Sequence, residues 1–336
     1  MIKTAIEKVV DGENLNEVEM LGTMNQIMGG DATPAQIGSF VTALRVKGET
    51  IDEITGAVRV MRQKATKIKT KHKLVVDTCG TGGDGSQTFN VSTTVAFVVA
   101  GAGVPVAKHG NRAISSRSGS ADVLKALGVN IEISPEMVGG CIDEIGIGFL
   151  FAPVLHGAMK HAIGPRREVG IRTVFNILGP LTNPAGAKAQ VIGVYDSNLT
   201  EPIANVLKNL GCQSAFVVHG DDGLDEITTT TTTQVSQLAY GNVINYIIDP
   251  IEFGIANADP SELIGGTPET NADITYSVLN GATGPKRDIT LINSAAAIVA
   301  GGKSSNIQSG LEIASAAIDS GKALEKLNAL VEVTNR

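Results

Sequence analysis

A glycine-rich segment in the first third of the chain has the residue types that bind phosphate. Residues 77–85 contain four glycines and follow an apolar run, and the polar residues 90–94 open a second apolar run. Glycine lets the backbone approach an anion closely, and the N–H groups of residues 92–94 would lie at a helix N-terminus, where the helix dipole favours negative charge. The segment has neither the lysine of a Walker loop nor the spacing of a dinucleotide-binding fingerprint. The alternative is a tight turn in which Ser92 or Thr93 only caps the helix.

A second polar segment, residues 108–120, has the composition of another anion-binding loop. Lys108 and two arginines lie among four serines. The segment follows a short apolar run and precedes a helical pattern over residues 121–127, so it repeats the strand–loop–helix order of the first segment. Ligands of α/β sheets bind at the carboxyl ends of strands, which would place the two loops side by side. The alternative is a solvated surface loop.

Two further segments carry charges suited to binding. Arg166 could hold a carboxylate through two parallel hydrogen bonds, although taken alone it is more typical of a surface arginine on a helix. Asp225 and Glu226 are adjacent carboxylates after an apolar run, and such a pair suits Mg²⁺ bound to a phosphorylated substrate. In isolation the pair is more typical of a solvated acidic turn. His156 and His161 precede Arg166, and each alone is more often structural than catalytic.

The elements that must position these residues begin with a helical region. The first 67 residues predict helices only. Asn16, Thr33 and Thr50 each stand three residues before Glu or Gln, which is the capping-box pattern of a helix start. The helix that starts at Thr33 is expected to end near Gly48. This region therefore predicts a small helical bundle.

Short apolar runs alternate with helical patterns from Lys73 on, which predicts an α/β domain with a mostly parallel central sheet. The expected strands are residues 74–76, 104–107, 148–151, 191–195 and 215–218, with a helix over 200–210. Residues 234–248, broken at Gly241-Asn242, predict a hairpin. The threonine run 228–233 predicts one more strand, and the Ala-rich sequence after Ile289 predicts helices.

Length, charge and cysteine content narrow the class of protein. The 336 residues are enough for one large and one small domain. A formal net charge of −7 argues against binding to nucleic acid or to an anionic membrane. Cys79, Cys141 and Cys212 form no closely spaced pair, which argues against a disulfide framework or zinc site and fits a reducing compartment. With no signal-peptide pattern at the N-terminus, we expect a cytoplasmic protein.

Together, these segments resemble the anthranilate phosphoribosyltransferases of tryptophan biosynthesis. The resemblance extends over nearly the whole chain, and its specificity comes from four motifs in order, at residues 79–84, 108–112, 176–184 and 223–226. It implies a homodimer. It also implies a small helical domain of residues 1–69, with a returning segment at about 166–186, and an α/β domain of residues 70–165 and 187–336 that binds phosphoribosyl diphosphate (PRPP).

The resemblance also implies site residues, position by position. The implied PRPP contacts are Gly80, Gly83, Asp84, Thr88, Asn90, Val91, Ser92, Thr93, Lys108, His109, Gly110, Asn111, Arg112, Ala113, Ile114, Ser115, Ser116 and Ser120. The implied anthranilate contacts are Gly80, His109, Asn111, His156, Arg166 and Gly179. The implied ligands of Mg²⁺, with two ions expected per subunit, are Ser92, Asp225 and Glu226. One departure is Gly157, because the family often has proline after the histidine that matches His156.

The activity implied by this resemblance is transfer of the phosphoribosyl group of PRPP to the amine of anthranilate. Lys108, His109, Asp225 and Glu226 are the expected catalytic residues. A phosphorylase of pyrimidine nucleosides has a similar fold, but it needs no carboxylate pair for a metal–diphosphate complex. A nucleic-acid-binding relative without transferase activity would need a basic surface, which the net charge disfavours. We therefore expect two small-molecule substrates and no membrane or nucleic-acid partner.

Overall fold

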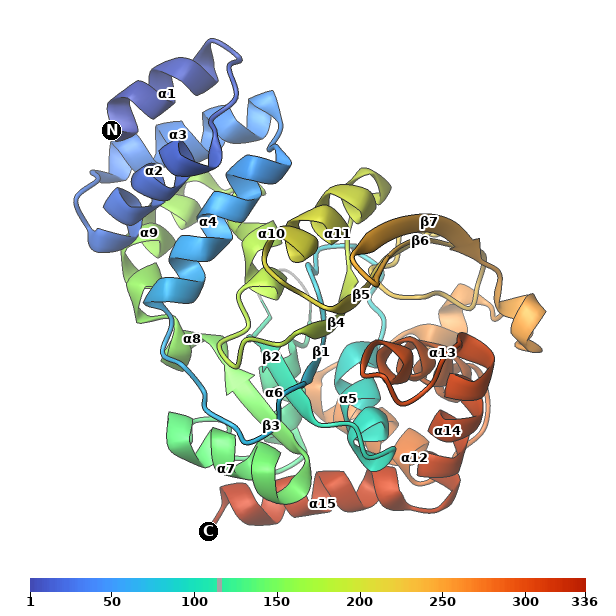
Figure 1. Cartoon of the computed structure of the whole chain (residues 1–336). Helices are drawn as coiled ribbons and strands as arrows, with labels where there is room; N and C mark the ends of the chain where they lie inside the picture. Colours follow the sequence, from blue (N-terminus) through green and yellow to red (C-terminus); the bar gives the residue numbers. More distant parts are fainter. Residues whose placement is uncertain (114–116) are drawn as a thin grey trace.

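A seven-stranded sheet forms the centre of the protein (Figure 1). The computed structural model describes residues 1–113 and 117–336. The strand order is β3-β2-β1-β4-β5-β6-β7; the first five of these pair in parallel and the last two pairings are antiparallel. The strands are β1 Val76–Gly80, β2 Val106–Gly110, β3 Ile147–Phe151, β4 Ala189–Gly193, β5 Ser214–Gly220, β6 Thr233–Ala239 and β7 Asn242–Ile248. The predicted mostly parallel sheet is confirmed.

The N-terminal region is a helical bundle, as predicted. Its helices are α1 Ile2–Val10, α2 Glu17–Gly29, α3 Pro34–Lys47 and α4 Ile51–Lys64. Capping boxes start α2, α3 and α4 at Asn16, Thr33 and Thr50, and Gly48 ends α3 with a positive φ. Each box satisfies backbone N–H groups that a helix start leaves without partners.

The chain returns to this bundle in its middle third. Helices α8 Ala152–Leu155, α9 Lys160–Val169 and α10 Val174–Leu181 follow β3, and Figure 1 shows α9 and α10 beside α2, α3 and α4. Buried side chains of α9 and α10, such as Ala162 and Leu178, belong to the same apolar cluster as Ile27 and Phe40 of the bundle. The domain boundaries at residues 69, 165 and 187 stay predictions.

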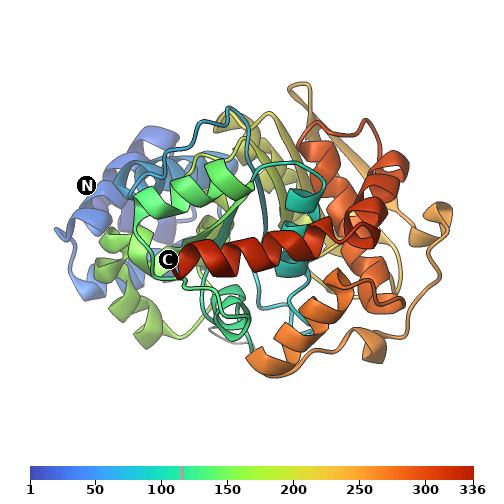
Figure 2. The same ribbon diagram turned by 90° about the horizontal axis from the view of Figure 1, so that it is seen from below.

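Helices cover both faces of the sheet. On one face lie α5 Val91–Gly101 and α13 Pro285–Ala300, and on the other lies α11 Thr200–Asn209. Side chains alternate between these faces along a strand. Val191 therefore belongs to the apolar cluster that includes α5 and α13, whereas Ile192 belongs to the cluster that includes α11. The remaining helices are α6 Ser120–Ala126, α7 Pro135–Ile145, α12 Pro268–Leu279, α14 Ile307–Asp319 and α15 Lys322–Thr334, with short 3-10 turns at Gly157–Met159, Ser197–Leu199, Pro250–Phe253 and Pro260–Leu263. Figure 2 shows α15 crossing the molecule beside α7.

The predicted strand over the threonine run is wrong. Only Thr233 belongs to a strand, β6, whereas residues 228–232 form an irregular loop. Thr228 and Thr230 donate side-chain hydrogen bonds to Asp222, and Thr232 donates one to Asp221. Short hydroxyl side chains can bond local groups in this way and so compete with the backbone ladder of a sheet.

Element ends also differ from the prediction. The sequence predicts a first strand over residues 74–76, but β1 begins only at Val76 and runs through Gly80 into the glycine-rich segment. The hairpin turns at Tyr240-Gly241, one residue before the predicted break, and both residues have positive φ, at 50° and 76°. Positive φ at both central positions is characteristic of the type I′ turn, which is common in two-residue hairpins. In the described ranges 1–113 and 117–336, no helix is long and apolar enough to cross a membrane.

Candidate active site

The candidate site lies where the order of the strands reverses. β1, β2 and β3 follow one another to one side, and β4 and β5 lie on the other side of β1, so ligands are expected at the carboxyl ends of β1 and β4. Gly80 pairs with Gly193 at these ends. A Cβ atom on Gly80 would overlap the carboxylate of Asp225, and one on Gly193 would overlap the Asp225 backbone oxygen. The two glycines therefore let Asp225 lie directly across the strand ends.

The glycine-rich loop is fixed from two sides. The N–H of Gly82 donates to Oδ2 of Asp225 at 2.7 Å. Arg172, from the segment between α9 and α10, donates to the carbonyl of Gly83 and lies over the ring of Tyr195, 4.6 Å from its centroid. Gly82 and Gly83 have φ of 65° and 76°, a left-handed backbone that suits glycine. These contacts tie the loop to Asp225 at Gly82 and to Arg172 at Gly83.

Asp225 and its neighbour Glu226 lie in a strongly acidic environment. Burial and then the charge of Asp84 raise the pKa of Asp225 to about 7. Burial and then the charge of Asp225 raise the pKa of Glu226 well above its usual range. Three carboxylates so close repel one another, which a bound cation would relieve.

Ser92 contacts both a carboxylate and an ammonium of the site. Its backbone N–H, at the start of α5, donates to Oε1 of Glu226 at 3.1 Å. Its hydroxyl lies 3.4 Å from Nζ of Lys108, which also donates to the carbonyl of Thr78 at 2.6 Å. An ammonium, a helix N-terminus and a carboxylate are therefore within reach of one small volume.

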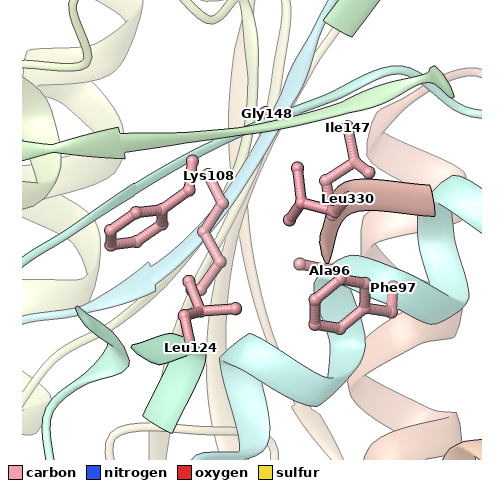
Figure 3. A pocket seen from close by; sticks show the side chains of 8 residues that line it. Ala96, Phe97, Lys108, Leu124, Ile147, Gly148 and Leu330 are labelled. Carbon is pink, nitrogen blue, oxygen red and sulfur yellow. The ribbon is translucent and has the colours of Figure 1, made fainter. Parts of the chain in front are cut away.

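Lys108 is almost fully buried, with 3% of its surface exposed. Burial lowers the pKa of its ammonium, an effect opposed by the nearby charge of Asp77. Its aliphatic stem borders a small cavity of about 10 Å³, together with Phe97, Leu124 and Leu330 (Figure 3). A cavity of that size holds at most about one water molecule, so apolar neighbours pack closely around the stem.

In the second predicted anion-binding loop, residues 108–120, several polar groups are bonded to other protein groups and are not directed at a ligand. The guanidinium of Arg112 pairs with Glu132 at 3.4 Å and lies 5.7 Å from the ring centroid of Phe151. The N–H of Ala113 donates to Asp122 at 2.9 Å, and the hydroxyl of Ser120 donates to the Asn111 carbonyl at 3.3 Å. Gly110 ends β2. The predicted contacts Ile114, Ser115 and Ser116 lie outside the described residues.

The predicted PRPP contacts in residues 88–93 differ in whether their side chains are free to meet a ligand. Oδ1 of Asn90 accepts hydrogen bonds from Nδ2 of Asn271 at 2.9 Å and from Oγ of Ser118 at 3.1 Å. Thr88 forms an isolated bridge with Ile264. Val91 and Thr93 have buried side chains, so a ligand here would meet their backbone N–H groups.

Two histidines, His109 in β2 and His156 directly after α8, form a neutral pair. Nε2 of His109 and Nε2 of His156 lie 3.1 Å apart, and both side chains are buried. Burial and then His156 lower the pKa of His109 to about 3, while the backbone of Gly179 acts in the opposite direction. Burial and then Lys67 lower the pKa of His156 to about 4. One imidazole must donate and the other accept, so their tautomers are linked.

Arg166 lies in α9 with its guanidinium 5.0 Å from the ring centroid of Phe175 in α10. Burial lowers the pKa of this guanidinium. Among the described residues it has no hydrogen-bonded carboxylate partner. A partly buried arginine without a counter-charge suits an anionic group of a ligand.

The described part of the chain holds no cluster of three or more His, Cys, Asp and Glu side chains that could bind a metal by itself. Mg²⁺ does not need such a cluster, because it commonly binds one or two carboxylates and takes its other oxygens from water and substrate phosphates. Asp225, Glu226 and Ser92 therefore fit the chemistry of a magnesium site that is completed by a ligand.

Comparison with known proteins gives the family. Residues 3–65 match the model described as glycosyl transferase family, helical bundle domain, and residues 72–324 match glycosyl transferase family, a/b domain. An anthranilate phosphoribosyltransferase of Acetivibrio thermocellus is 59% identical over 335 residues, covering 100% of this chain and 97% of that protein. The chain belongs to the anthranilate phosphoribosyltransferase family.

Solved structures of the same family share the whole fold. The anthranilate phosphoribosyltransferase of Thermus thermophilus matches with a TM-score of 0.94 and 41% identity over 99% of each chain. The Saccharomyces cerevisiae protein, in complex with PRPP and Mg, matches with a TM-score of 0.91 and 28% identity over 99% of this chain and 98% of that one. The predicted fold, a helical N-terminal part with a larger α/β part, is therefore confirmed.

Several residues of this family member were missed by sequence reasoning. Asp77 and Asn183 lie buried beside Lys108 and His109, and Arg172 holds the glycine-rich loop. Asp77 and Asn183 were inside recognised motifs but received no role. A charged residue directly after the apolar Val75-Val76 was the available signal, because a buried carboxylate needs partners. No pattern in the sequence pointed to Arg172.

The histidine pair should contribute a loss of stability in acid. An unfolded chain protonates its imidazoles near pH 6.5, whereas His109 and His156 stay neutral in the folded protein down to about pH 3 and 4. Below pH 6.5 each imidazole therefore binds more protons in the unfolded state, and its contribution to the free energy of unfolding should fall by up to about 1.4 kcal/mol per pH unit. Asp77, Asp225 and Glu226, whose pKa values are raised in the folded protein, act in the opposite direction, so the histidine contribution is measured as a difference between two proteins. Urea denaturation of the unmodified protein and of His156→Asn between pH 8 and 5 gives this difference. The unmodified protein should lose more stability, or gain less, than His156→Asn as the pH falls, and the same pH dependence in both would contradict the assignment.

Proposed function

We propose that this protein transfers the phosphoribosyl group of PRPP to the amine of anthranilate, giving N-(5-phosphoribosyl)anthranilate and diphosphate, as a step of tryptophan biosynthesis. The observation that carries the proposal is the convergence of Lys108, the N-terminus of α5 and Glu226 on Ser92. That combination suits a diphosphate and its metal ion. The relatives named anthranilate phosphoribosyltransferase support this function over a phosphorylase-like or nucleic-acid-binding one.

The leaving diphosphate presents the main electrostatic problem of this reaction. The ammonium of Lys108 and the N–H groups at the start of α5 would stabilise the charge that develops on it, as preorganised donors. Asp225, Glu226 and Ser92 would hold Mg²⁺, with two ions per subunit proposed, and bound Mg²⁺ supplies further positive charge against the diphosphate. The carboxylates would thus bind the metal ion, whereas the ammonium of Lys108 would bind the diphosphate.

The acceptor side of the site needs orientation more than a strong base. The aromatic amine of anthranilate is neutral at pH 7 and can attack C1 of the ribose directly as the C1–O bond to diphosphate breaks, through a transition state with oxocarbenium character. The acidic arylammonium that forms then gives one proton to the departing diphosphate or to water. Arg166 would hold the anthranilate carboxylate, and Gly179, Asn111 and Gly80 would line its path. Since burial keeps the pKa of His109 at about 3, His109 is a weak base. We propose that the His109–His156 pair orients the amine through neutral hydrogen bonds.

We also propose that the protein is a cytoplasmic homodimer. The three free cysteines agree with a reducing compartment, and the homodimer is what the family resemblance implies.

The proposed activity can be tested with purified protein by following anthranilate fluorescence. We expect the signal to fall only when protein, PRPP and Mg²⁺ are all present, because the product differs from anthranilate at the amine. Omission of each component in turn is the control. A folded protein that leaves the fluorescence constant would refute the proposed function.

Replacing Arg166 should affect the two substrates unequally. Because a charge-assisted hydrogen bond contributes about 1.5–3 kcal/mol, Arg166→Ala should raise the KM for anthranilate by roughly 10- to 100-fold. The KM for PRPP should change little. Arg167→Ala, at the exposed neighbouring position, is the matched control and should resemble the unmodified protein. Equal increases for both substrates would count against Arg166 as the carboxylate ligand.

Removing the charges of Asp225 and Glu226 should weaken binding of Mg²⁺–PRPP and lower the transferase activity. The double variant Asp225→Asn/Glu226→Gln should lose activity by about 100-fold or more, since metal-assisted charge stabilisation contributes several kcal/mol. Its binding of Mg²⁺–PRPP by calorimetry should weaken in parallel. Glu312→Gln/Glu325→Gln, two exposed positions on α14 and α15, makes the same change in net charge and should be neutral. Normal turnover of the site variant at low Mg²⁺ would overturn the assignment.

A further inference from the structure

The sheet separates between the two strands that carry the glycine-rich loop and Lys108. In the described residues, β1 pairs with β4 at five positions and β2 with β3 at five, but β1 and β2 pair only through Val76 and Val106. Beyond that pair, the backbone groups of β1 and β2 that face each other need other partners, because buried N–H and C=O groups are rarely left without one.

Two buried side chains supply these partners. Oδ1 of Asp77 accepts from the backbone N–H of His109 at 3.0 Å. Nδ2 of Asn183 donates to Oδ2 of Asp77 at 2.7 Å and to the carbonyl of Ala107 at 2.8 Å. Asp77 has no exposed surface and Asn183 has 1%. The backbone on both sides of Lys108 is therefore held by this pair.

The buried charge of Asp77 is stabilised by its neighbours. Burial raises the pKa of its carboxyl to about 6, and the charge of Lys108 is the largest effect that opposes burial. The N–H of His109 and the amide of Asn183 act in the same direction as Lys108. A buried carboxylate that lost one of these partners would keep its desolvation cost.

Asn183 extends the connection to the helical part of the protein. It lies two residues after the end of α10, which packs on α4. Nε of Arg62, in α4, donates to the carbonyl of Leu181 at 2.8 Å, and Oδ1 of Asn183 accepts from the N–H of Ala185. The segment that brings Asn183 to the sheet is thus held at both ends.

We propose that Asp77 and Asn183 are positioning residues for the phosphoribosyl transfer, which together fix the Lys108–His109 segment of β2 against β1 and against the segment after α10. Since both side chains are buried, we expect neither to touch a substrate. The proposal rests on the proposed function, because its consequence is the placement of Lys108 toward the leaving diphosphate and of His109 toward the amine.

The experiment compares two single variants with their exchange. Asp77→Asn sets an amide N–H against another donor, either His109 N–H or Asn183 Nδ2, and Asn183→Asp sets two carboxylates against each other. Since misplacement of catalytic groups by about 1 Å can cost 100-fold in rate, each single variant should lower kcat by roughly 10- to 100-fold. Both KM values should change by less than about threefold, because the substrate contacts themselves remain.

The exchange variant Asp77→Asn/Asn183→Asp restores one donor and one acceptor between the two positions and keeps the net charge. It should regain about tenfold in kcat over the lower single variant, although the Ala107 carbonyl loses its donor. A role in stability alone predicts no such recovery of kcat at a temperature where all three variants are folded. If a single variant does not fold, Asn183→Ala, which removes both donated bonds and adds no repulsion, is measured in its place.

Glu53 provides a matched control far from the site. Like Asp77 it has no exposed surface, it accepts from the backbone N–H groups of Leu15 and Thr50 at 2.9 and 2.7 Å, and it pairs with Lys47 at 3.0 Å. Glu53→Gln should lower the midpoint of thermal unfolding and leave kcat unchanged.

The outcomes separate the two proposals. An unmodified protein without transferase activity would refute the proposed function before any variant is compared. An active unmodified protein whose folded single variants keep kcat within about twofold would overturn the positioning role. So would an exchange variant with no recovery over the singles, or a loss of kcat in Glu53→Gln equal to that in Asp77→Asn.

Discussion

The burial of the Lys108 ammonium is the constraint on which the rest of the site depends. A cation removed from water is costly unless charges and hydrogen-bond acceptors surround it. Here the carbonyl of Thr78, the hydroxyl of Ser92 and the carboxylates of Asp77 and Glu226 lie around it. They come from β1, from the start of α5 and from the loop after β5. The low-dielectric surroundings that make burial costly would also strengthen the attraction of Lys108 for a leaving diphosphate, which is the role proposed for it.

Close approach of the backbone makes this arrangement possible. Asp225 crosses the ends of β1 and β4 because Gly80 and Gly193 have no side chains there, and its carboxylate then reaches the N–H of Gly82. Burial and then the mutual repulsion of Asp84, Asp225 and Glu226 raise the pKa of the last two. The acidic half of the site therefore disfavours full ionisation by itself, and a metal ion bound with a phosphorylated ligand would favour the charged form.

Much of this arrangement was predictable because it depends on local sequence. The capping boxes at Asn16, Thr33 and Thr50, the alternation of strands and helices, and the motifs around Lys108 and Asp225 all reflect short-range patterns. The threonine run was mispredicted because hydrogen bonds to Asp221 and Asp222 outweigh its strand propensity. The low pKa of His109 and the role of Asp77 could not be predicted, since both depend on burial and on residues far away in the chain. Asn183 is 106 positions from Asp77.

The same long-range contacts explain why the helical segment after β3 belongs to the site. Arg166 and Gly179, on the side proposed for the acceptor, come from α9 and α10, whereas Lys108 and Ser92, on the diphosphate side, come from the sheet and α5. A transfer between two substrates requires these two groups of residues to keep a fixed relation, because attack at C1 tolerates little displacement. His109 contacts His156 at the start of the helical segment, and Asp77 contacts Asn183 at its end. The segment is thus joined to the β1–β2 pair at both of its ends, so a displacement of either group would have to break a buried hydrogen bond.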